Sequence, residues 1–314
     1  MLKYTLARIL HAVIVLFGVS IIVFVMIHLL PGGPARALLG PRATPQDVRA
    51  FNAEYGYDKP LVIQYFVWLS EVLRGNLGFS VKLNQQVSSV IAARLPGTAL
   101  LVGLANLLAI LIAVPVGLAQ AVRRNKFFDY LATGFGFLFY SMPVFWLGLI
   151  LVVLLSEQFH LLPPIVPQAS FGQLLLHPGD IALPVITLTL VTTALFSRYM
   201  RSSALENLPL DYVRTARAKG VGRQRVIWRH VLRNAAGPLI TLVGLTLPVV
   251  VGGAVIVESV FNYPGMGLLF WNAAQSQDYP VILGVTIVTG AATVLGSLIA
   301  DLLYAVADPR VRFT

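Results

Sequence analysis

The sequence predicts an all-α polytopic membrane protein with six transmembrane helices. Its residues are 57% hydrophobic and only 11% charged, a balance outside the usual range of a soluble domain. Six apolar runs are long enough to cross a bilayer, which needs about 20 residues. Basic residues gather in alternate connections between these runs. We expect the spans at residues 8–30, 98–121, 129–155, 181–203, 235–258 and 281–304.

The composition and motifs also exclude several kinds of site. The chain has no cysteine, so neither disulfides nor thiolate metal ligands are available. It contains no G-x-x-x-x-G-K-[ST] phosphate-binding loop and no G-x-S-x-G nucleophile elbow. Its histidines lack the H-E-x-x-H spacing of a zinc site. We therefore expect no catalytic site, no metal and no cofactor in this chain.

Residues 1–30 are predicted to form a retained transmembrane helix. Lys3 and Arg8 precede a long apolar run. That run exceeds the core of a signal peptide, which has about 7–15 residues, and no small-residue cleavage site follows it. The Pro-Gly-Gly-Pro sequence at 31–34 ends the helix.

Residues 31–94 form the one substantial polar insert. They carry both charge signs, several aromatic residues and turn signals at Asp58-Lys59-Pro60 and Gly75-Asn76. This composition is too apolar for a disordered linker. We expect a small helical insert, packed on the membrane surface.

Basic residues set the predicted orientation. Three follow the second span, and Arg310 and Arg312 lie in the tail. Nine are assigned to the connection after the fourth span: Arg198, Arg201, Arg214, Arg217, Lys219, Arg223, Arg225, Arg229 and Arg233. The connections 156–180 and 259–280 contain no Lys or Arg. The positive-inside rule then places both termini in the cytoplasm and the 31–94 insert outside.

Proline and hydroxyl residues occur at depth in the third and fourth spans. They can serve helix packing alone, because hydroxyls bond back to their own helix. They can also line a path through kinked helices. The candidate path residues are Ser141, Pro143, Thr189, Thr193 and Ser197, and the sequence leaves both interpretations open.

Residues 211–239 form a basic island between apolar runs. The pattern predicts two short amphipathic helices broken at Gly220-Val221-Gly222, where glycine permits a positive φ angle. Tyr212, Val213 and Ala216 share one arc of the first helix, which we expect to approach a groove of a soluble partner. In the second helix, an apolar arc (Ile227, Trp228, Val231, Leu232) lies beside a basic stripe (Arg225, Arg229, Arg233). Anchoring to anionic lipid is the alternative explanation of the charge.

The same island resembles a known family. Arg214-Thr215-Ala216, three residues and then Gly220 is similar to the EAA---G loop of bacterial ABC-importer permeases. The general pattern continues with I-x-L-P, of which only Leu232 is present here. The sequences RTARAKG and RHVLRNA are instead similar to the dipeptide/oligopeptide/nickel branch. Further similarity to that branch covers nearly the whole chain, including Arg94-Leu95-Pro96-Gly97-Thr98, 141–148, 264–267 and 301–312.

The resemblance implies a fold, a function and a set of partners. The fold would be the six-helix core of a type I ABC importer permease, with an N-terminal helix at 1–30, an extracytoplasmic insert at 31–94 and a five-helix core at 95–314 that includes cytoplasmic coupling helices at 209–233. The residues that dock to the ATPase would be Tyr212, Val213, Arg214, Thr215, Ala216, Arg217, Lys219 and Gly220. The chain would be the first permease of a pair in a bacterial inner membrane. Its partners would be a second homologous permease, two ATPase subunits that bind ATP and Mg, an extracytoplasmic binding protein, membrane lipid and a di- or oligopeptide, with no nucleic acid.

Two alternatives remain. Nickel, glutathione or another small solute could be the substrate within the same family. A secondary transporter driven by an ion gradient would need ionisable or unwound sites at mid-membrane. Glu258 and Asp301 are the acids nearest to this requirement, and both lie at the ends of expected spans, where the headgroup level is the expected environment.

Overall fold

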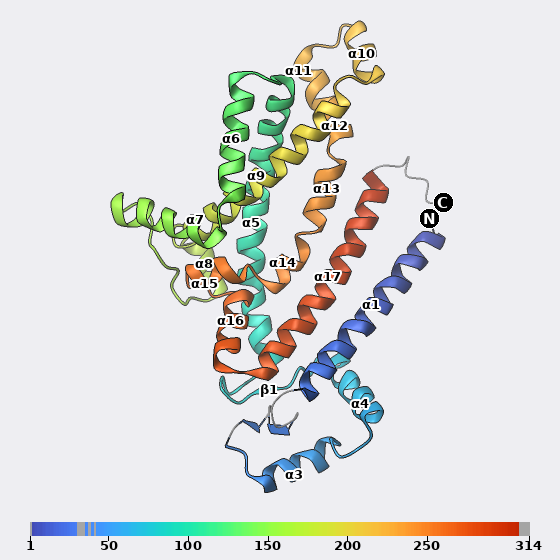
Figure 1. Cartoon of the computed structure of the whole chain (residues 1–314), viewed down its shortest axis with the longest axis vertical. Helices are drawn as coiled ribbons and strands as arrows, with labels where there is room; N and C mark the ends of the chain where they lie inside the picture. The colour runs from blue at the N-terminus through green and yellow to red at the C-terminus, as the bar shows by residue number, and fades with distance from the viewer. Residues whose placement is uncertain (1, 30–34, 37–38, 41, 308–314) are drawn as a thin grey trace. The chain divides into compact units, whose positions relative to one another are not determined.

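The computed structural model describes residues 2–29, 35–36, 39–40 and 42–307, which are predominantly helical (Figure 1). One two-stranded antiparallel hairpin, β1 (Phe79–Ser80) and β2 (Gln85–Gln86), is the sheet found in this part of the chain. The helices are α1 (Leu2–His28), α3 (Pro45–Tyr55), α4 (Leu61–Leu73), α5 (Val87–Val122), α6 (Phe127–Ser141), α7 (Val144–Leu151), α8 (Phe171–Leu176), α9 (Ala182–Asn207), α10 (Asp211–Ala218), α11 (Arg223–Arg225), α12 (Leu232–Ala235), α13 (Gly237–Gly244), α14 (Leu247–Gly252), α15 (Val255–Val260), α16 (Met266–Ser276) and α17 (Tyr279–Ala307), with π-helical segments η1 (Val152–Gln158) and η2 (Val226–Val231).

The predicted all-α, polytopic membrane class is confirmed. Four helices, α1, α5, α9 and α17, are long and apolar enough to cross a membrane. The number rises to six if each of two bent helix pairs is one span. Only 17% to 50% of each apolar window is buried inside the protein, so large apolar side chains face outward, as contact with lipid requires.

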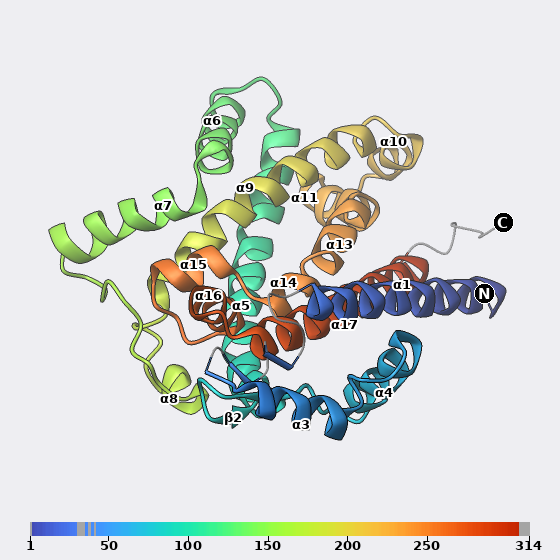
Figure 2. The ribbon, with the colours of Figure 1, turned by 60° about the horizontal axis from the view of Figure 1, so that its bottom comes forward.

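The third predicted span, 129–155, is not straight. Its halves, Phe127–Ser141 and Val144–Gln158, meet at an angle of 106°, a bend that is visible between α6 and α7 in Figures 1 and 2. Pro143 has no backbone N–H and excludes the preceding residue from the helical region. Met142 accordingly has extended angles of φ −78° and ψ 130°. Pro143 alone predicts a kink, but not so sharp a bend.

The fifth predicted span, 235–258, is also interrupted. Helix α13 ends at Gly244, α14 ends at Gly252 and α15 begins at Val255. Gly253 has φ +91°, and a Cβ atom there would collide with the backbone of Gly267. Only glycine fits both the angle and the close approach, so the helix breaks here.

The chain divides into two compact units. The first unit comprises residues 1–99, 248–259 and 264–295. Its core joins the start of α5 to α16 and α17 through Val87, Ile91, Met266 and Val281. Within the same unit, α4 of the insert packs on α1. The hydroxyls of Ser20 and Tyr65 lie 2.7 Å apart, and His28 Nε2 lies 2.9 Å from Gln64 Oε1.

The second unit comprises residues 100–247, 260–263 and 296–314, and it is described as far as residue 307. Its core joins α5 and α9 to the helices from α10 to α13. Helices α5 and α9 touch at Gly117, where an added Cβ would lie 2.7 Å from the Cβ of Met200 and 2.8 Å from the carbonyl oxygen of Ser197. These units do not follow the predicted boundaries at 30 and 94. The predicted boundaries mark where the chain is expected to leave and re-enter the membrane, and they remain a prediction. Arg310 and Arg312 lie outside the described residues.

Candidate functional site

The basic island folds as the two predicted short helices with a glycine between them. Asp211 lies in the first turn of α10, where a carboxylate is favourable beside the partial positive charge of the helix N-terminus. At the other end, Gly220 has φ +76°. Its N–H donates to the carbonyl of Arg217 at 2.9 Å, and the N–H of Val221 donates to that of Ala216 at 3.1 Å. This bond pair is the Schellman motif, which favours glycine at its left-handed position.

The second helix differs from the predicted wheel because it is π-helical from Val226 to Val231. A π-turn adds a residue to each turn and shifts the phase of the buried face. Val226 is therefore buried, although the 3.6-residue wheel omitted it. Trp228, which was expected on the apolar arc, is 49% exposed. The predicted stripe of Arg225, Arg229 and Arg233 does lie on the surface.

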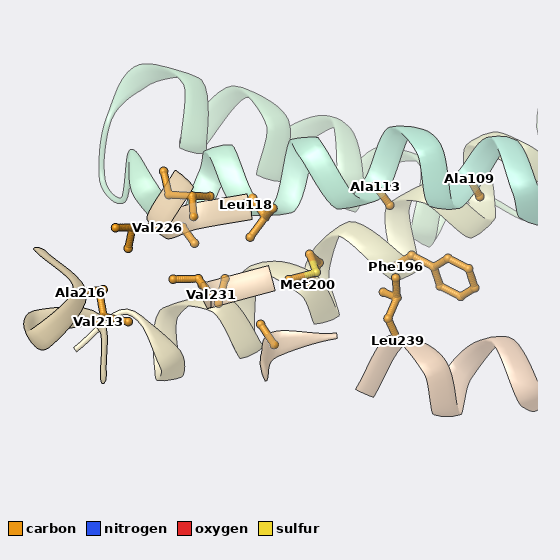
Figure 3. Packing of buried hydrophobic residues seen from close by; sticks show 14 residues of the cluster. Ala109, Ala113, Leu118, Phe196, Met200, Val213, Ala216, Val226, Val231 and Leu239 are labelled. Atoms are coloured by element: carbon orange, nitrogen blue, oxygen red, sulfur yellow. The ribbon is translucent and has the colours of Figure 1, made fainter. Parts of the chain in front are cut away.

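The inner sides of both helices join the main core of the second unit. Val213 and Ala216 of α10 pack in one cluster with Val226 and Val231 of η2 and Met200 of α9 (Figure 3). Leu118 of α5 belongs to the same cluster. A displacement of α10 would therefore be transmitted to two long helices, because close-packed interiors transmit strain.

The buried cluster includes two of the predicted docking residues. Val213 is 0% exposed and Ala216 is 8% exposed, so the chain itself covers most of the arc that was expected to face a partner. The arc that contains them is apolar because the chain's own second helix covers it. The outer surface instead carries five of the predicted docking residues: Arg214, Thr215, Arg217, Lys219 and Gly220.

Tyr212 lies between the two faces and is half-buried. Its hydroxyl donates to Oδ1 of Asn207 at 2.9 Å, which ties α10 to the end of α9. Burial raises the pKa of Tyr212 above its ordinary value, and a hydrogen bond with Asn234 opposes that shift. Tyr212 therefore stays neutral at physiological pH and positions α10.

The candidate path residues lie in two places along the chain, at the bend between α6 and α7 and along α9. Ser141 and Pro143 are exposed at the bend after α6. Thr189 is buried and donates to the carbonyl of Ala105 at 3.4 Å, a weak bond. The buried hydroxyl of Thr193 has no hydrogen-bond partner within the described residues. Ser197 is the one candidate that borders a pocket of about 210 Å³.

That pocket lies among α5, α6 and α9, beside an ion pair that the sequence analysis missed. Asp129, whose side chain is 3% exposed, accepts from Nε of Arg201 at 2.7 Å and from a terminal guanidinium nitrogen at 2.8 Å. Asp129 also accepts the N–H of Asn125 at 3.0 Å. Arg198 and Arg201 were counted among basic residues of the cytoplasmic connection, whereas the structure places both inside α9. The sequence did contain one signal of this ion pair, which is an acidic residue within the apolar third span.

Glu258 has a structural role that its position at the end of an expected span did not reveal. It is completely buried in the first unit. One carboxylate oxygen accepts from the hydroxyl of Thr98 at 3.0 Å and from the N–H of Ala254 at 3.0 Å. The other accepts from the N–H groups of Gly267 and Leu268 at 2.7 and 3.1 Å. Glu258 therefore caps helix α16, which a sequence pattern cannot show because the partners are distant in the chain.

Among the described residues, no group of three or more His, Asp or Glu side chains is arranged to hold a metal ion. The island has a basic outer surface, and its apolar inner surface packs in the same core as α5 and α9. The pocket beside α9 offers cationic and polar groups for binding.

Comparison with known proteins identifies relatives over the full length. Residues 105–313 match the family described as "Binding-protein-dependent transport system inner membrane component", and residues 1–102 match the N-terminal family of such membrane components. A Brucella suis protein named provisionally as a peptide permease is 43% identical, and the alignment covers 100% of both chains. The oligopeptide transport system permease protein AppB of Bacillus subtilis is 38% identical with the same coverage. The glutathione transport system permease protein GsiC of Salmonella paratyphi A is 36% identical, again over 100% of both chains.

Proposed function

The chain belongs to the family of binding-protein-dependent transport system inner membrane components, and on that premise we propose that it forms part of the translocation path of an ATP-driven importer for di- or oligopeptides. Relatives named for oligopeptide and dipeptide transport, aligned over almost the whole chain, support the peptide substrate. Glutathione, for which another relative is named, is the second candidate. Nickel and other small solutes are the remaining candidates.

The observation that carries the proposal is the two-sided island from α10 to α12. Its inner side belongs to the same core as α5 and α9, and its outer side presents Arg214, Arg217 and Lys219. A partner that holds the outer side can therefore move membrane helices without entering the membrane. This chain has no phosphate-binding loop, so ATP and Mg would be bound by two ATPase subunits.

The remaining partners follow from this arrangement. We propose a second homologous permease beside this chain and an extracytoplasmic binding protein that delivers substrate. Both termini and the α10–α12 island would face the cytoplasm, with residues 31–94 outside. This chain itself would not catalyse a reaction. Closure of the ATPases would move the island and alternate the access of the path.

Docking can be tested by reversing charge on the exposed face of α10. We expect Arg217→Glu to insert normally but to lose co-purification of the ATPase subunits and peptide uptake, because like charges across an interface oppose association. Lys82→Glu is a matched control, because Lys82 is also exposed and lies outside the island. If Arg217→Glu retains the ATPases, the outer face of α10 is not the docking surface. ATP-independent uptake by the purified chain alone would instead support the secondary-transporter alternative.

A further inference from the structure

The pocket among α5, α6 and α9 has features that packing alone does not require. Its volume is about 210 Å³, and its polar lining comprises Gln120, Thr133, Tyr140, Ser197, Arg198 and Arg201. Pockets for whole drug-sized ligands are larger, roughly 300–1,000 Å³. This pocket can therefore hold one end of an extended ligand.

The pocket contains two arginines, and only one of them is neutralised. Arg201 is held by the buried carboxylate of Asp129 through two bonds of 2.7 and 2.8 Å. Arg198 forms no ion pair with any of the described residues. Its guanidinium carbon lies 4.9 Å from the ring centre of Tyr140 and 5.8 Å from that of Tyr199. Aromatic faces attract a cation but leave its N–H donors available to an anion.

The side chain of Arg198 is exposed in this chain, and its guanidinium lies far along α6 from the start of that helix. Tyr140 is the last residue but one of α6, a helix of 15 residues whose start lies beside Asp129. The ring therefore lies about 20 Å along the helix axis from its first residue. An arginine that serves only as an anchor extends toward the nearest polar surface. Charged groups within apolar helices usually face a cavity or a partner, so an exposed cation of α9 without an acidic partner is available to an anionic ligand.

Gln120 supplies a second, independent feature. Its side chain is buried, at 3% exposure, and its Nε2 donates to the hydroxyl of Thr133 at 3.1 Å. Its Oε1 is buried with no hydrogen-bond partner in the described part of the chain. A buried acceptor without a donor is costly, so a ligand that brings an N–H group would satisfy it.

We propose that this pocket binds the C-terminal residue of the transported peptide, with Arg198 receiving the carboxylate and Gln120 accepting an amide N–H. The last residue of a peptide carries both groups, an anion and a neighbouring N–H donor. This inference rests on the proposed peptide-importer function and adds the part of the substrate that the permease recognises. A peptide with a blocked C-terminus would lose the interaction with Arg198 and keep the rest.

The test uses the complete transporter in proteoliposomes, with its second permease, ATPases and binding protein. Two peptides are compared that are identical except for a C-terminal carboxylate or a C-terminal amide. The measured quantity is the ratio of ATP-dependent uptake of the acid to that of the amide. Any preference of the binding protein affects each variant equally, so it cancels when ratios are compared between variants.

We expect Arg198→Gln to lower this ratio by about tenfold or more, because hydrogen bonds to charged groups are stronger than neutral ones. Arg198→Lys should lower the ratio of acid to amide uptake much less, since it keeps the positive charge. Lys82→Gln removes an exposed cation outside the pocket and should leave the ratio unchanged.

The outcomes separate this inference from the function on which it rests. If the wild-type transporter takes up neither peptide, the peptide-importer function is wrong and the carboxylate assignment is wrong with it. If the wild type takes up peptides but Arg198→Gln leaves the ratio unchanged, the inference alone is overturned. A third outcome is that Arg198→Gln loses co-purifying anionic phospholipid while its peptide uptake is unchanged. That result would assign the pocket to lipid and would also overturn the inference.

Discussion

Thr98 donates its hydroxyl to the carboxylate of Glu258 at 3.0 Å, although 160 positions separate the two residues. The Thr98 oxygen in turn accepts the N–H of Met266 at 2.7 Å, while Glu258 accepts those of Gly267 and Leu268. These are the first three amides of α16, which have no partner within their own helix. The two side chains thus cap a helix that begins inside the protein.

Removing this cap should destabilise the protein. Glu258→Ala leaves buried amides without an acceptor, and each costs about 1–3 kcal/mol. We expect an apparent loss of about 2–4 kcal/mol in unfolding free energy, seen as an earlier thermal transition in detergent. Glu258→Gln keeps one acceptor oxygen, so its loss of unfolding free energy should lie between those of the wild type and Glu258→Ala. Glu206→Ala, at an exposed position of α9, is the control. If Glu258→Ala unfolds at the same temperature as the wild type, the capping role is contradicted.

The ion pair of Asp129 and Arg201 should show strong coupling. Asp129→Ala leaves a partly buried guanidinium without its carboxylate, and breaking such a pair costs about 3–5 kcal/mol. The double variant Asp129→Ala, Arg201→Met should be less destabilised than Asp129→Ala alone, because no uncompensated charge remains. Thermal unfolding of the two single variants and the double variant completes a cycle. Additive losses would show that the two residues act independently.

Gly117 and Gly103 provide a matched pair on α5. A Cβ at Gly117 would collide with Met200 and with the backbone of Ser197, whereas one at Gly103 would meet nothing within 4 Å. We expect Gly117→Ala to lower stability by about 1–3 kcal/mol through overpacking. Gly103→Ala should be neutral or stabilising by up to about 1 kcal/mol, because alanine favours the helix. Equal effects of the two changes would rule out close packing of α5 on α9.

Gly220 should tolerate asparagine but not valine. A Cβ there would meet nothing within 4 Å, so the constraint is the φ angle of +76° and not space. A branched residue in this region is strained by about 1–2 kcal/mol, whereas asparagine visits it readily. We expect Gly220→Val to insert but to lose ATPase association and uptake, and Gly220→Asn to behave nearly as the wild type. Normal transport by Gly220→Val would show that the turn is not needed for coupling.

The predicted orientation can be measured in this cysteine-free chain. Lys82→Cys should react with an impermeant thiol reagent added from outside intact cells, and Arg124→Cys should react only after the inner face is opened. Both positions are exposed. Arg124 is preferable to its neighbour Asn125, whose φ of +60° would strain a cysteine. Reversed labelling would overturn the assignment of both termini to the cytoplasm.

Much of the fold class and part of the candidate functional site can be predicted from local sequence features. Long apolar runs of about 20 residues predict helices that cross a bilayer, because a helix satisfies its backbone hydrogen bonds internally in lipid. The pair of short helices in the island and the glycine at 220 were also accessible, since amphipathic periodicity and turn chemistry are properties of neighbouring residues. The resemblance of the same stretch to ABC-importer permeases supplied the family, which the comparisons show.

Other features depended on residues that are far apart in the chain. A helical wheel shows that Val213 and Ala216 are on an apolar arc, but it cannot show whether a partner or the chain's own η2 covers that arc. The π-helical turn at Val226 shifts the buried face in a way that a 3.6-residue period cannot express. The pairing of Asp129 with Arg201 and of Glu258 with Thr98 depends on which helices lie side by side. Sequence by itself therefore determined the membrane class, the approximate positions of the apolar runs and the glycine turn at 220. Tertiary structure decided where the third and fifth predicted spans break, which faces are covered and which partners the buried charges have, because burial is a property of the neighbours and not of the residue.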